Sequence, residues 1–432
     1  MDLQDELKSY RKIVRKELDE YEGEEHSEMI FRCCSGDQQA EDYMIRAIRE
    51  ILAKYGMEGE RLETLSYEIY KKEYGLSVIH DLVANRKKQY NNIECIGYDW
   101  IEVEKSNGLW ERLDLSFEDE KEFEEVIRRA IQHDNKPDIN TENSLMESKR
   151  VSGERITAGV RPSCYENYLF IKLFSSFTPS EESYISSGAL AEEMISFTKI
   201  LFKILPAIAI IGGINRGKSS FLKYLVSLLN PKFKIGTLEP DFEVKLQELL
   251  KDRNIISLQE SSQFDLLACF KWLLRTNRDV IIVGEARGAE INEAGKASRR
   301  GIGCTFLTAH VIDPESLPEE FAQMHLENGI PMDIDFLMYR YAKAFPITYR
   351  IRQLEGGRRI IDDISELVAD RRSRTYYRNP LFIWDPKTKE HKRVGGIKGE
   401  DQRMRMDYYN LTEEEKEQLL YDPEKKKIKV AL

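Results

Sequence analysis

The chain has 432 residues, of which 33% are charged and 41% hydrophobic, a balance typical of a soluble globular protein with two or three domains. Its formal net charge of -11 leaves no basic surplus to neutralise nucleic-acid phosphates, so we expect no direct nucleic-acid partner. The six cysteines have neither the density of a disulfide framework nor the spacing of metal ligands, which favours reduced thiols.

Membrane insertion is not predicted. The first residues, MDLQDELKSYRK, lack the apolar core of a signal peptide. The longest apolar run, residues 204–213, contains Pro206 and is too short to span a bilayer. We therefore expect a cytoplasmic protein without a transmembrane segment, which reaches a membrane only through a partner.

Residues 1–90 have the periodicity of charged amphipathic helices and contain no catalytic grouping. We assign them as a helical N-terminal region. The lone histidines His26 and His80 are predicted to be solvated imidazoles. The apolar positions of the first two helices are Leu3, Leu7, Ile13, Val14 and Leu18, then Ile45, Ile48, Ile51 and Leu52.

Residues 91–176 change to an α+β pattern. Two strand-like runs, 100–104 and 110–115, flank Asn107-Gly108, a dipeptide that favours a hairpin because both central turn residues need φ > 0. Either Ser116 or Asp119 can cap the following helix, whose apolar face spans residues 123–131. A second strand pair, 155–158 and 169–174, completes a compact α+β module.

The segment AIAIIGGINRGKSS, residues 207–220, combines a buried strand, two glycines and the start of an amphipathic helix. Its spacing is that of a P-loop, in which backbone N–H groups surround a β-phosphate, a lysine reaches the β/γ oxygens and a hydroxyl binds Mg²⁺. The alternative is a glycine-rich turn without a ligand. The predicted phosphate-binding residues are Gly212, Gly213, Asn215, Arg216, Gly217, Lys218, Ser219 and Ser220, with Ser219 also on the metal.

Strands and helices alternate over residues 233–283, which predicts a mostly parallel sheet with right-handed crossovers. Three strand-like runs end in polar side chains, and in a parallel sheet such ends gather at one edge, where ligands bind. Acidic groups there can hold Mg²⁺ and orient water, while arginine and histidine can meet a γ-phosphate. These side chains are Glu239, Asp241 and Glu243, then Glu285 and Arg287, then Thr308 and His310.

The remaining sequence predicts two hairpins and a terminal helix. The first hairpin joins residues 345–354 and 358–364 across Gly356-Gly357, and the second joins residues 381–384 and 392–394. Thr412 with Glu415 forms a capping box for the last helix. The closing run EKKKIKVAL is predicted to be a solvated tail. We assign residues 177–432 as one α/β domain that carries the P-loop.

Together these motifs resemble the secretion and pilus ATPase superfamily of type II secretion, type IV secretion and type IV pili. Within it, the likeness is nearest to the tight-adherence (CpaF-type) pilus branch. That branch has GGTGSGKTT, TIEDPxE, RPDRIIVGEVRG and GHxGSxxTxHA where this chain has GGINRGKSS, TLEPDFE, NRDVIIVGEARG and GIGCTFLTAHV. GERITA and IKLF in the α+β module resemble the family's GSRV and IRKF. The resemblance covers residues 93–367 and implies a RecA-like P-loop NTPase domain preceded by a PAS-like module.

Several positions depart from the family pattern. Ile214, Asn215 and Arg216 replace Thr, Gly and Ser, which places a guanidinium where a small side chain is usual. Pro240 stands where the Asp box has its aspartate, and Ile302 and Cys304 replace the first His and the second Gly of the His box. In the α+β module, Lys149 and Lys172 stand where the family usually has arginine. These departures indicate a divergent member and leave open whether hydrolysis is fast or impaired.

The resemblance also implies roles for individual residues. Glu285 would polarise the attacking water, although an ion pair with Arg287 is the alternative. Glu239 would contact metal or water, or else be a solvated strand-end carboxylate. His310 would sense the γ-phosphate, or be a hydrogen-bonded core histidine. Arg155 would reach the phosphates in cis or across a subunit boundary, with Arg161 or Lys149 as substitutes, or else be an ordinary exposed arginine.

The function implied by the resemblance is a homohexameric, ATP-hydrolysing ring that requires Mg²⁺. It would act on an inner-membrane platform protein to drive pilus assembly or protein secretion, with the α+β module and the P-loop domain closing over Mg-ATP. A type IV secretion or conjugation motor is one alternative, and a nucleotide-binding but hydrolytically weak assembly subunit is another. A RecA-type DNA motor is a further one, against which the acidic charge argues.

Overall fold

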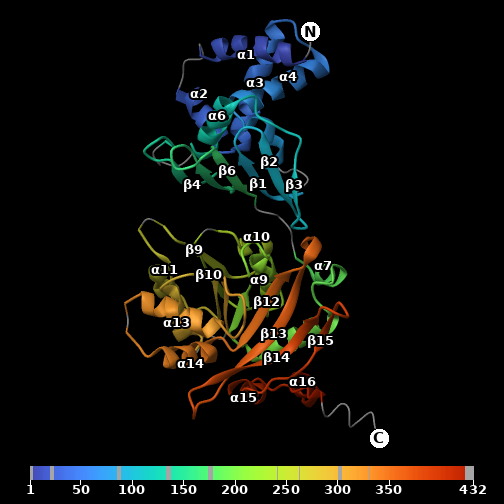
Figure 1. Ribbon diagram of the computed structural model, residues 1–432, viewed down its shortest axis with the longest axis vertical. Helices are drawn as coiled ribbons and strands as arrows, with labels where there is room; N and C mark the ends of the chain where they lie inside the picture. Colours follow the sequence, from blue (N-terminus) through green and yellow to red (C-terminus); the bar gives the residue numbers. More distant parts are fainter. Residues whose placement is uncertain are drawn as a thin grey trace. The chain divides into compact units, whose positions relative to one another are not determined.

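The computed structural model describes residues 3–19, 24–84, 89–132, 138–173, 179–240, 242–261, 263–299, 304–329 and 331–423. Asp241, residues 301–303 of the His-box segment and the basic tail therefore lie outside the described residues. The chain forms two compact units, Met1–Ser176 and Phe177–Leu432 (Figure 1). No helix within the described ranges is long and apolar enough to cross a bilayer.

The first unit begins with the predicted N-terminal helices. They are α1 (Leu3–Asp19), α2 (Glu24–Cys34), α3 (Gln38–Lys54), α4 (Gly59–Glu73), a 3₁₀ turn (Ser77–Ile79) and α5 (His80–Ala84). Asp37 caps α3 by accepting from the N–H groups of Gln39 and Ala40, which otherwise lack helical partners. The apolar stripes of these helices form one core that contains Val14, Leu18, Met44, Ile48, Ile51, Leu52, Leu65 and Ile69.

A six-stranded antiparallel sheet follows in the same unit, in the order β3-β2-β1-β6-β5-β4. Helix α6 (Glu120–Ile131) is capped by Asp119, whose carboxylate accepts from the N–H of Glu122 at 2.8 Å, and the helix packs its apolar face on the sheet. Gly108 has φ 85° at the predicted hairpin turn. The strands are β1 (Tyr90–Ile96), β2 (Trp100–Lys105), β3 (Trp110–Arg112), β4 (Leu145–Lys149), β5 (Arg155–Gly159) and β6 (Tyr168–Lys172).

The helices and the sheet are joined by buried and half-buried polar contacts. Arg129 of α6 donates to the carbonyls of Lys72 and Glu73 at the end of α4, and Arg150 donates to the carbonyl of Cys34. The division expected at residue 90 stays a prediction. The prediction of a solvated His80 is wrong, because its ring is 6% exposed and packs edge-on against Tyr70.

The second unit is built on a nine-stranded sheet in the order β15-β14-β13-β12-β7-β11-β10-β8-β9. The six strands from β12 to β9 are parallel, as the alternating pattern predicted. They are β7 (Ile208–Ile211), β8 (Ile235–Glu239), β9 (Ile255–Gln259), β10 (Val280–Ala286), β11 (Cys304–Ala309) and β12 (Ile347–Gln353).

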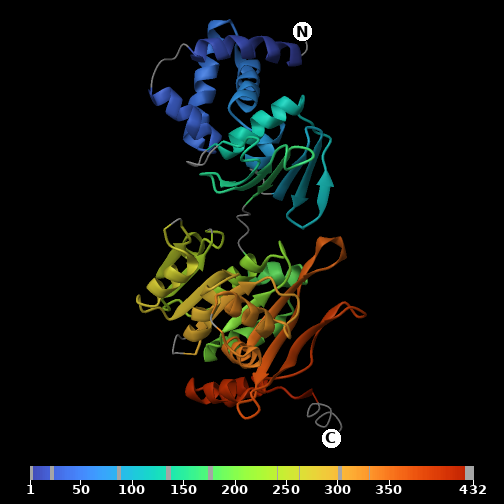
Figure 2. The same cartoon turned by 60° about the vertical axis from the view of Figure 1, so that its left-hand side comes forward.

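Helices cover both faces of this sheet, and each face has its own hydrophobic core. One core is formed with α8 (Glu192–Leu201), α9 (Lys218–Ser227), α10 (Leu246–Leu249), α15 (Glu400–Tyr408) and α16 (Glu413–Leu419). The other is formed with α11 (Leu266–Leu273), α12 (Glu290–Ala297), α13 (Leu317–Glu327) and α14 (Ile334–Ala344), of which α13 and α14 lie side by side in Figures 1 and 2. A short helix, α7 (Glu181–Ser186), precedes α8.

The sheet ends in antiparallel strands, β13 (Arg359–Ala369), β14 (Tyr376–Asp385) and β15 (Glu390–Arg393), so both predicted hairpins are confirmed. The capping box of Thr412 and Glu415 at α16 is also confirmed. The helix predicted over residues 243–250 is reduced to the single turn α10, because Lys245 adopts a left-handed conformation with φ 47°.

Candidate functional site

The backbone of the predicted P-loop is fixed between a fully buried strand and a helix. Strand β7 lies between β11 and β12, and the loop leaves its carboxyl end at Gly212. Gly212 has φ 147°, and a Cβ there would lie 2.6 Å from the carbonyl oxygen of Ile351. Gly217 has φ 88° and precedes α9. The chain therefore needs glycine at both ends of the loop.

The first turn of α9 is suited to an anion. Its N-cap is Gly217, which has no side chain to cap the helix, and its first residue, Lys218, is 6% exposed. Ser219 and Ser220 follow in the same turn and are half-buried. Because the N–H groups of a first helical turn have no intrahelical acceptor, they favour a phosphate oxygen at this position.

Lys218, His310 and Glu285 form one chain of polar contacts at the carboxyl ends of three strands. The Lys218 ammonium donates to the carbonyls of Gly212 at 3.0 Å and Gly213 at 2.8 Å, and its Nζ lies 3.1 Å from His310 Nδ1. His310 Nε2 lies 2.9 Å from Glu285 Oε1. Since the ammonium can only donate, we assign His310 as accepting at Nδ1 and donating from Nε2.

Glu285 is held in its ionised form. The hydrogen bond from His310 lowers the pKa of Glu285 most, burial opposes this, and the positive charges of Arg287 and Lys218 lower it further. The predicted alternative, an ion pair with Arg287, is not what forms. The Arg287 guanidinium instead lies 3.2 Å from Glu260, and its backbone N–H donates to the buried Glu290.

Glu239 lies deep in the sheet rather than in solvent, so the alternative of a solvated strand-end carboxylate is wrong. It is 1% exposed, and its Oε2 accepts from the N–H groups of Glu243 at 2.9 Å and Val244 at 2.6 Å. Burial raises the pKa of Glu239 to about 7. Its Cγ is 2.8 Å from the position that a Cβ on Gly284 would take, so it packs against the neighbouring strand β10, which carries Glu285.

The other predicted residues occupy more peripheral places. The P-loop tip is exposed at Ile214, with 73% of the side chain accessible, and at Asn215, whose φ of 56° is left-handed. Arg216 folds back so that its Nε is 3.5 Å from the position of a Cβ on Gly213. Arg155 begins β5 in the first unit, where it stands between Lys149 and Lys172 across the strands. Its phosphate-binding role stays a prediction.

The residues at the loop fit Mg²⁺ that arrives with a nucleotide better than a resident metal centre. Across the described part of the chain, no three His, Cys, Asp or Glu side chains are placed to hold a metal ion. Mg²⁺ usually takes one or two protein ligands and completes its octahedron with phosphate oxygens and water. Ser219, in the first turn of α9, is the hydroxyl placed for such a role.

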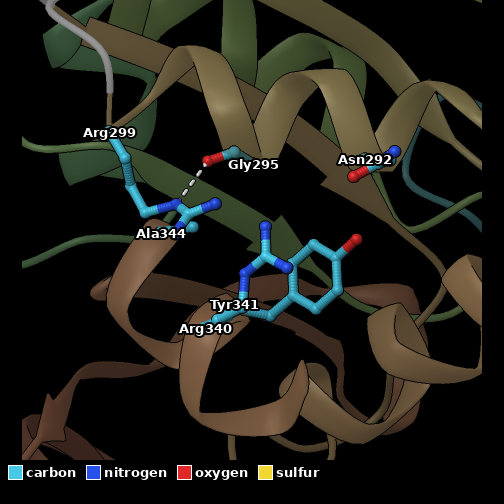
Figure 3. Close-up of a pocket in the computed structure, with 6 residues that line it drawn as sticks. All are labelled: Asn292, Gly295, Arg299, Arg340, Tyr341 and Ala344. Atoms are coloured by element: carbon cyan, nitrogen blue, oxygen red, sulfur yellow. Dashed lines mark hydrogen bonds between the residues drawn. The ribbon is translucent and has the colours of Figure 1, made fainter. Parts of the chain in front are cut away.

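A separate recess lies between α12 and α14 and involves none of the predicted site residues (Figure 3). It is lined by Asn292, Gly295, Arg299, Arg340, Tyr341 and Ala344. Both guanidinium groups are engaged within the protein. Arg299 donates to the carbonyl of Gly295, and Arg340 contacts Met332 and covers the ring of Phe336. We interpret this recess as packing between helices.

The parallel sheet, with β11 between the P-loop strand and the Glu285 strand, and the loop beside it define a RecA-like P-loop NTPase fold. A family model described as "Type II/IV secretion system protein" matches residues 100–326, more than half of the chain. The chain belongs to this family of secretion and pilus ATPases.

Two archaeal relatives come from Methanocaldococcus jannaschii. Uncharacterized protein MJ1287 is 26% identical over 212 residues, which are 47% of this chain and 74% of the relative. Uncharacterized protein MJ0900 is 23% identical over 301 residues, which are 65% of this chain and only 50% of the relative.

Three solved structures are similar at low identity. The VirB11 ATPase of the Brucella suis type IV secretion system, in complex with sulphate, is 17% identical, with 65% of this chain and 90% of that chain covered and a TM-score of 0.37. The pilus retraction motor PilT with bound ADP is 15% identical, with coverage of 81% and 98% and a TM-score of 0.47. The Legionella pneumophila ATPase DotB is 14% identical, with coverage of 82% and 94% and a TM-score of 0.45.

Proposed function

We propose that this chain is an ATPase motor that powers pilus assembly or protein secretion. Family membership supports the class of machine. The observation that carries the enzymatic proposal is the chain of contacts from Lys218 through His310 to Glu285. The His310 imidazole lies between the Lys218 ammonium of the phosphate-binding loop and the ionised carboxylate of Glu285. All three side chains are at the edge of the sheet where α/β proteins bind their ligands.

Each residue of this chain has a task in the proposed reaction. The first turn of α9 and the Lys218 ammonium bind the phosphates of ATP. Ser219 would hold Mg²⁺, which would supply positive charge to the phosphate oxygens. Glu285 accepts a hydrogen bond from the attacking water and orients it toward the γ-phosphorus. His310 keeps Glu285 ionised and turned toward the loop. When a γ-phosphate draws the Lys218 ammonium away from the Gly212 and Gly213 carbonyls, His310 loses that donor.

The larger assembly is part of the same proposal. We place the chain in a homohexameric ring, in the cytoplasm and peripheral to the inner membrane through a platform protein, with the tight-adherence pilus system as the nearest machine. Arg155 would supply a cation from the first unit. A ring predicts a particle of six times 50.5 kDa in mass photometry with Mg-ATP. A single-chain mass at every nucleotide concentration would remove the ring from the proposal.

A second candidate is a nucleotide-binding assembly subunit that hydrolyses ATP weakly. Two observations favour it over a fast motor. The Lys218 ammonium is held by carbonyls of its own loop, and Arg216 places a bulky cation beside Gly213 where the family has small side chains.

Phosphate release at saturating Mg-ATP separates the candidates. Lys218→Ala is expected to lose both nucleotide binding and hydrolysis, because the phosphates lose their ammonium. Glu285→Gln is expected to keep binding and to lose hydrolysis by about 100-fold or more, the usual size of a general-base effect. Glu260→Gln is the control, since Glu260 pairs with Arg287 outside the contact chain. Binding without release in the wild type would support the assembly subunit, and release that Lys218→Ala leaves unchanged would remove the enzyme.

A further inference from the structure

The hairpin of β12 and β13 stands directly against the P-loop. Strand β12 runs parallel to β7, with Arg350 opposite Ile211, so both strands reach the same edge of the sheet. The contact is close, because the carbonyl oxygen of Ile351 leaves no space for a Cβ on Gly212. The P-loop therefore packs against β12 on one side and contacts His310, which follows β11, on the other.

Strand β13 returns to this edge with an arginine. Its first residue, Arg359, pairs with Gln353 of β12. The Cδ of Arg359 is 3.6 Å, and its Nη1 is 4.0 Å, from the position a Cβ on Gly217 would occupy. The side chain of Arg359 thus lies along the last glycine of the P-loop, at the amino-terminal end of α9.

The hairpin is braced by ion pairs that fix this geometry. The Arg350 guanidinium makes two hydrogen bonds to Asp362, at 2.9 and 3.0 Å, and a third to Asp313 at 2.6 Å. Asp362 also accepts from Arg352 at 2.6 Å. Asp313 follows His310 by three residues, so the hairpin is tied to the segment that carries the imidazole of the site. A half-buried, multiply bonded network of this kind holds its members in one arrangement.

From these contacts we infer that Arg359 is a further nucleotide-binding residue of this chain, on the side of the α- and β-phosphates. The inference rests on the proposed function. In a P-loop the backbone N–H groups around the second glycine cradle the α/β-phosphates, while the lysine extends toward the γ-phosphate. Arg359 lies against that glycine, whereas Lys218, His310 and Glu285 mark the other side. A guanidinium suits this place because its planar donors match phosphate oxygens in pairs.

The position of Arg359 predicts how its loss affects the binding of ATP and of ADP. A contact with the α- and β-phosphates is made equally by ATP and ADP. Loss of the contact should therefore weaken both nucleotides by the same factor and leave the preference between them unchanged. A contact with the γ-phosphate would instead weaken ATP alone. The neighbouring Arg358 provides a matched control, because it is exposed and its guanidinium lies over the Trp384 ring, 5.1 Å from the centroid.

The test is calorimetric titration of the full chain with ATP and with ADP in the presence of Mg²⁺. Arg359→Gln is expected to raise the dissociation constants for both nucleotides by about 10- to 100-fold, the range for a lost hydrogen bond to a charged group. Arg359→Lys should weaken binding less, because lysine keeps the positive charge but lacks the paired donors of the guanidinium. Arg358→Gln should bind as the wild type does, and circular dichroism should show equal melting temperatures.

Three results would count against the inference. Unchanged binding of both nucleotides by Arg359→Gln and Arg359→Lys would overturn it, while the proposed function would stand. A loss for ATP alone would overturn the assignment to the α- and β-phosphates. A wild-type chain that binds neither nucleotide would remove the proposed function and this inference together, which distinguishes that failure from the other two.

Discussion

Replacing Glu239 with glutamine should stabilise the second unit at neutral and alkaline pH. The carboxyl group is 1% exposed, and burial raises its pKa from 4.5 to about 7. Each pH unit of difference between the folded and unfolded pKa is ~1.4 kcal/mol, so ionised Glu239 costs roughly 3 kcal/mol of folding free energy. Glutamine keeps an oxygen for the N–H groups of Glu243 and Val244 and carries no charge.

The sign of the effect follows from proton linkage. The folded state binds a proton at Glu239 that the unfolded state has released between pH 4.5 and about 7, so the wild type loses stability as the pH rises through this window. Glu239→Gln should therefore match the wild type near pH ~4.5 and exceed it by up to about 3 kcal/mol above pH ~8. Urea unfolding followed by tryptophan fluorescence measures the difference, since Trp272 and Trp384 lie in the second unit.

The control for this series is Glu248→Gln. Glu248 leaves 73% of its side chain exposed, and its nearest cation, Lys245, is 3.9 Å away. Its substitution should change stability by no more than a few tenths of a kcal/mol at any pH, as expected for an exposed pair. If Glu239→Gln is less stable than the wild type at pH ~8, or if the difference does not grow with pH, burial does not destabilise the ionised form of Glu239 as described.

Three further substitutions test other parts of the structure. His310→Ala removes the hydrogen bond that lowers the pKa of Glu285, so the acid limb of the ATPase pH profile should move to higher pH; an unmoved limb would mean that Glu285 does not set it. Gly284→Ala places a Cβ 2.8 Å from Glu239 and should cost about 1–3 kcal/mol of unfolding free energy in urea; an unchanged midpoint would contradict the close packing. Arg129→Met uncaps the last carbonyls of α4 and should lower stability by about 1–3 kcal/mol, read as a lower melting temperature of the first unit; no change would show that water replaces the guanidinium.

The local parts of the fold could be predicted from the sequence because they depend on neighbouring residues. The strand, the glycine turn and the helix of residues 207–220 follow from an apolar run, two glycines and helical periodicity. The parallel order of the sheet follows from alternating strands and helices. The P-loop motif and the alternation of strands and helices are together enough to predict that Lys218 and Glu285 lie at the same edge of the sheet.

Contacts that depend on tertiary packing could not be predicted in this way. No local pattern shows that the His310 ring spans the interval between Lys218 and Glu285, or that Glu239 turns inward to the N–H groups of its own loop. No sequence pattern indicates that Arg359 lies beside the P-loop. It follows Gly217 by more than a hundred residues and reaches it only because β13 pairs with β12. His80 was misjudged for the same reason, since charged neighbours in sequence do not reveal burial under Tyr70.

In the proposed motor, Lys218, His310 and Glu285 surround the terminal phosphate of a bound nucleotide. A structure of the chain with Mg²⁺ and a non-hydrolysable ATP analogue tests it most directly. We expect the γ-phosphate within hydrogen-bond distance of the Lys218 ammonium, with Mg²⁺ on Ser219 and a water on Glu285. A nucleotide bound elsewhere, or a Lys218 ammonium that still binds the carbonyls of Gly212 and Gly213 with the analogue present, would contradict it.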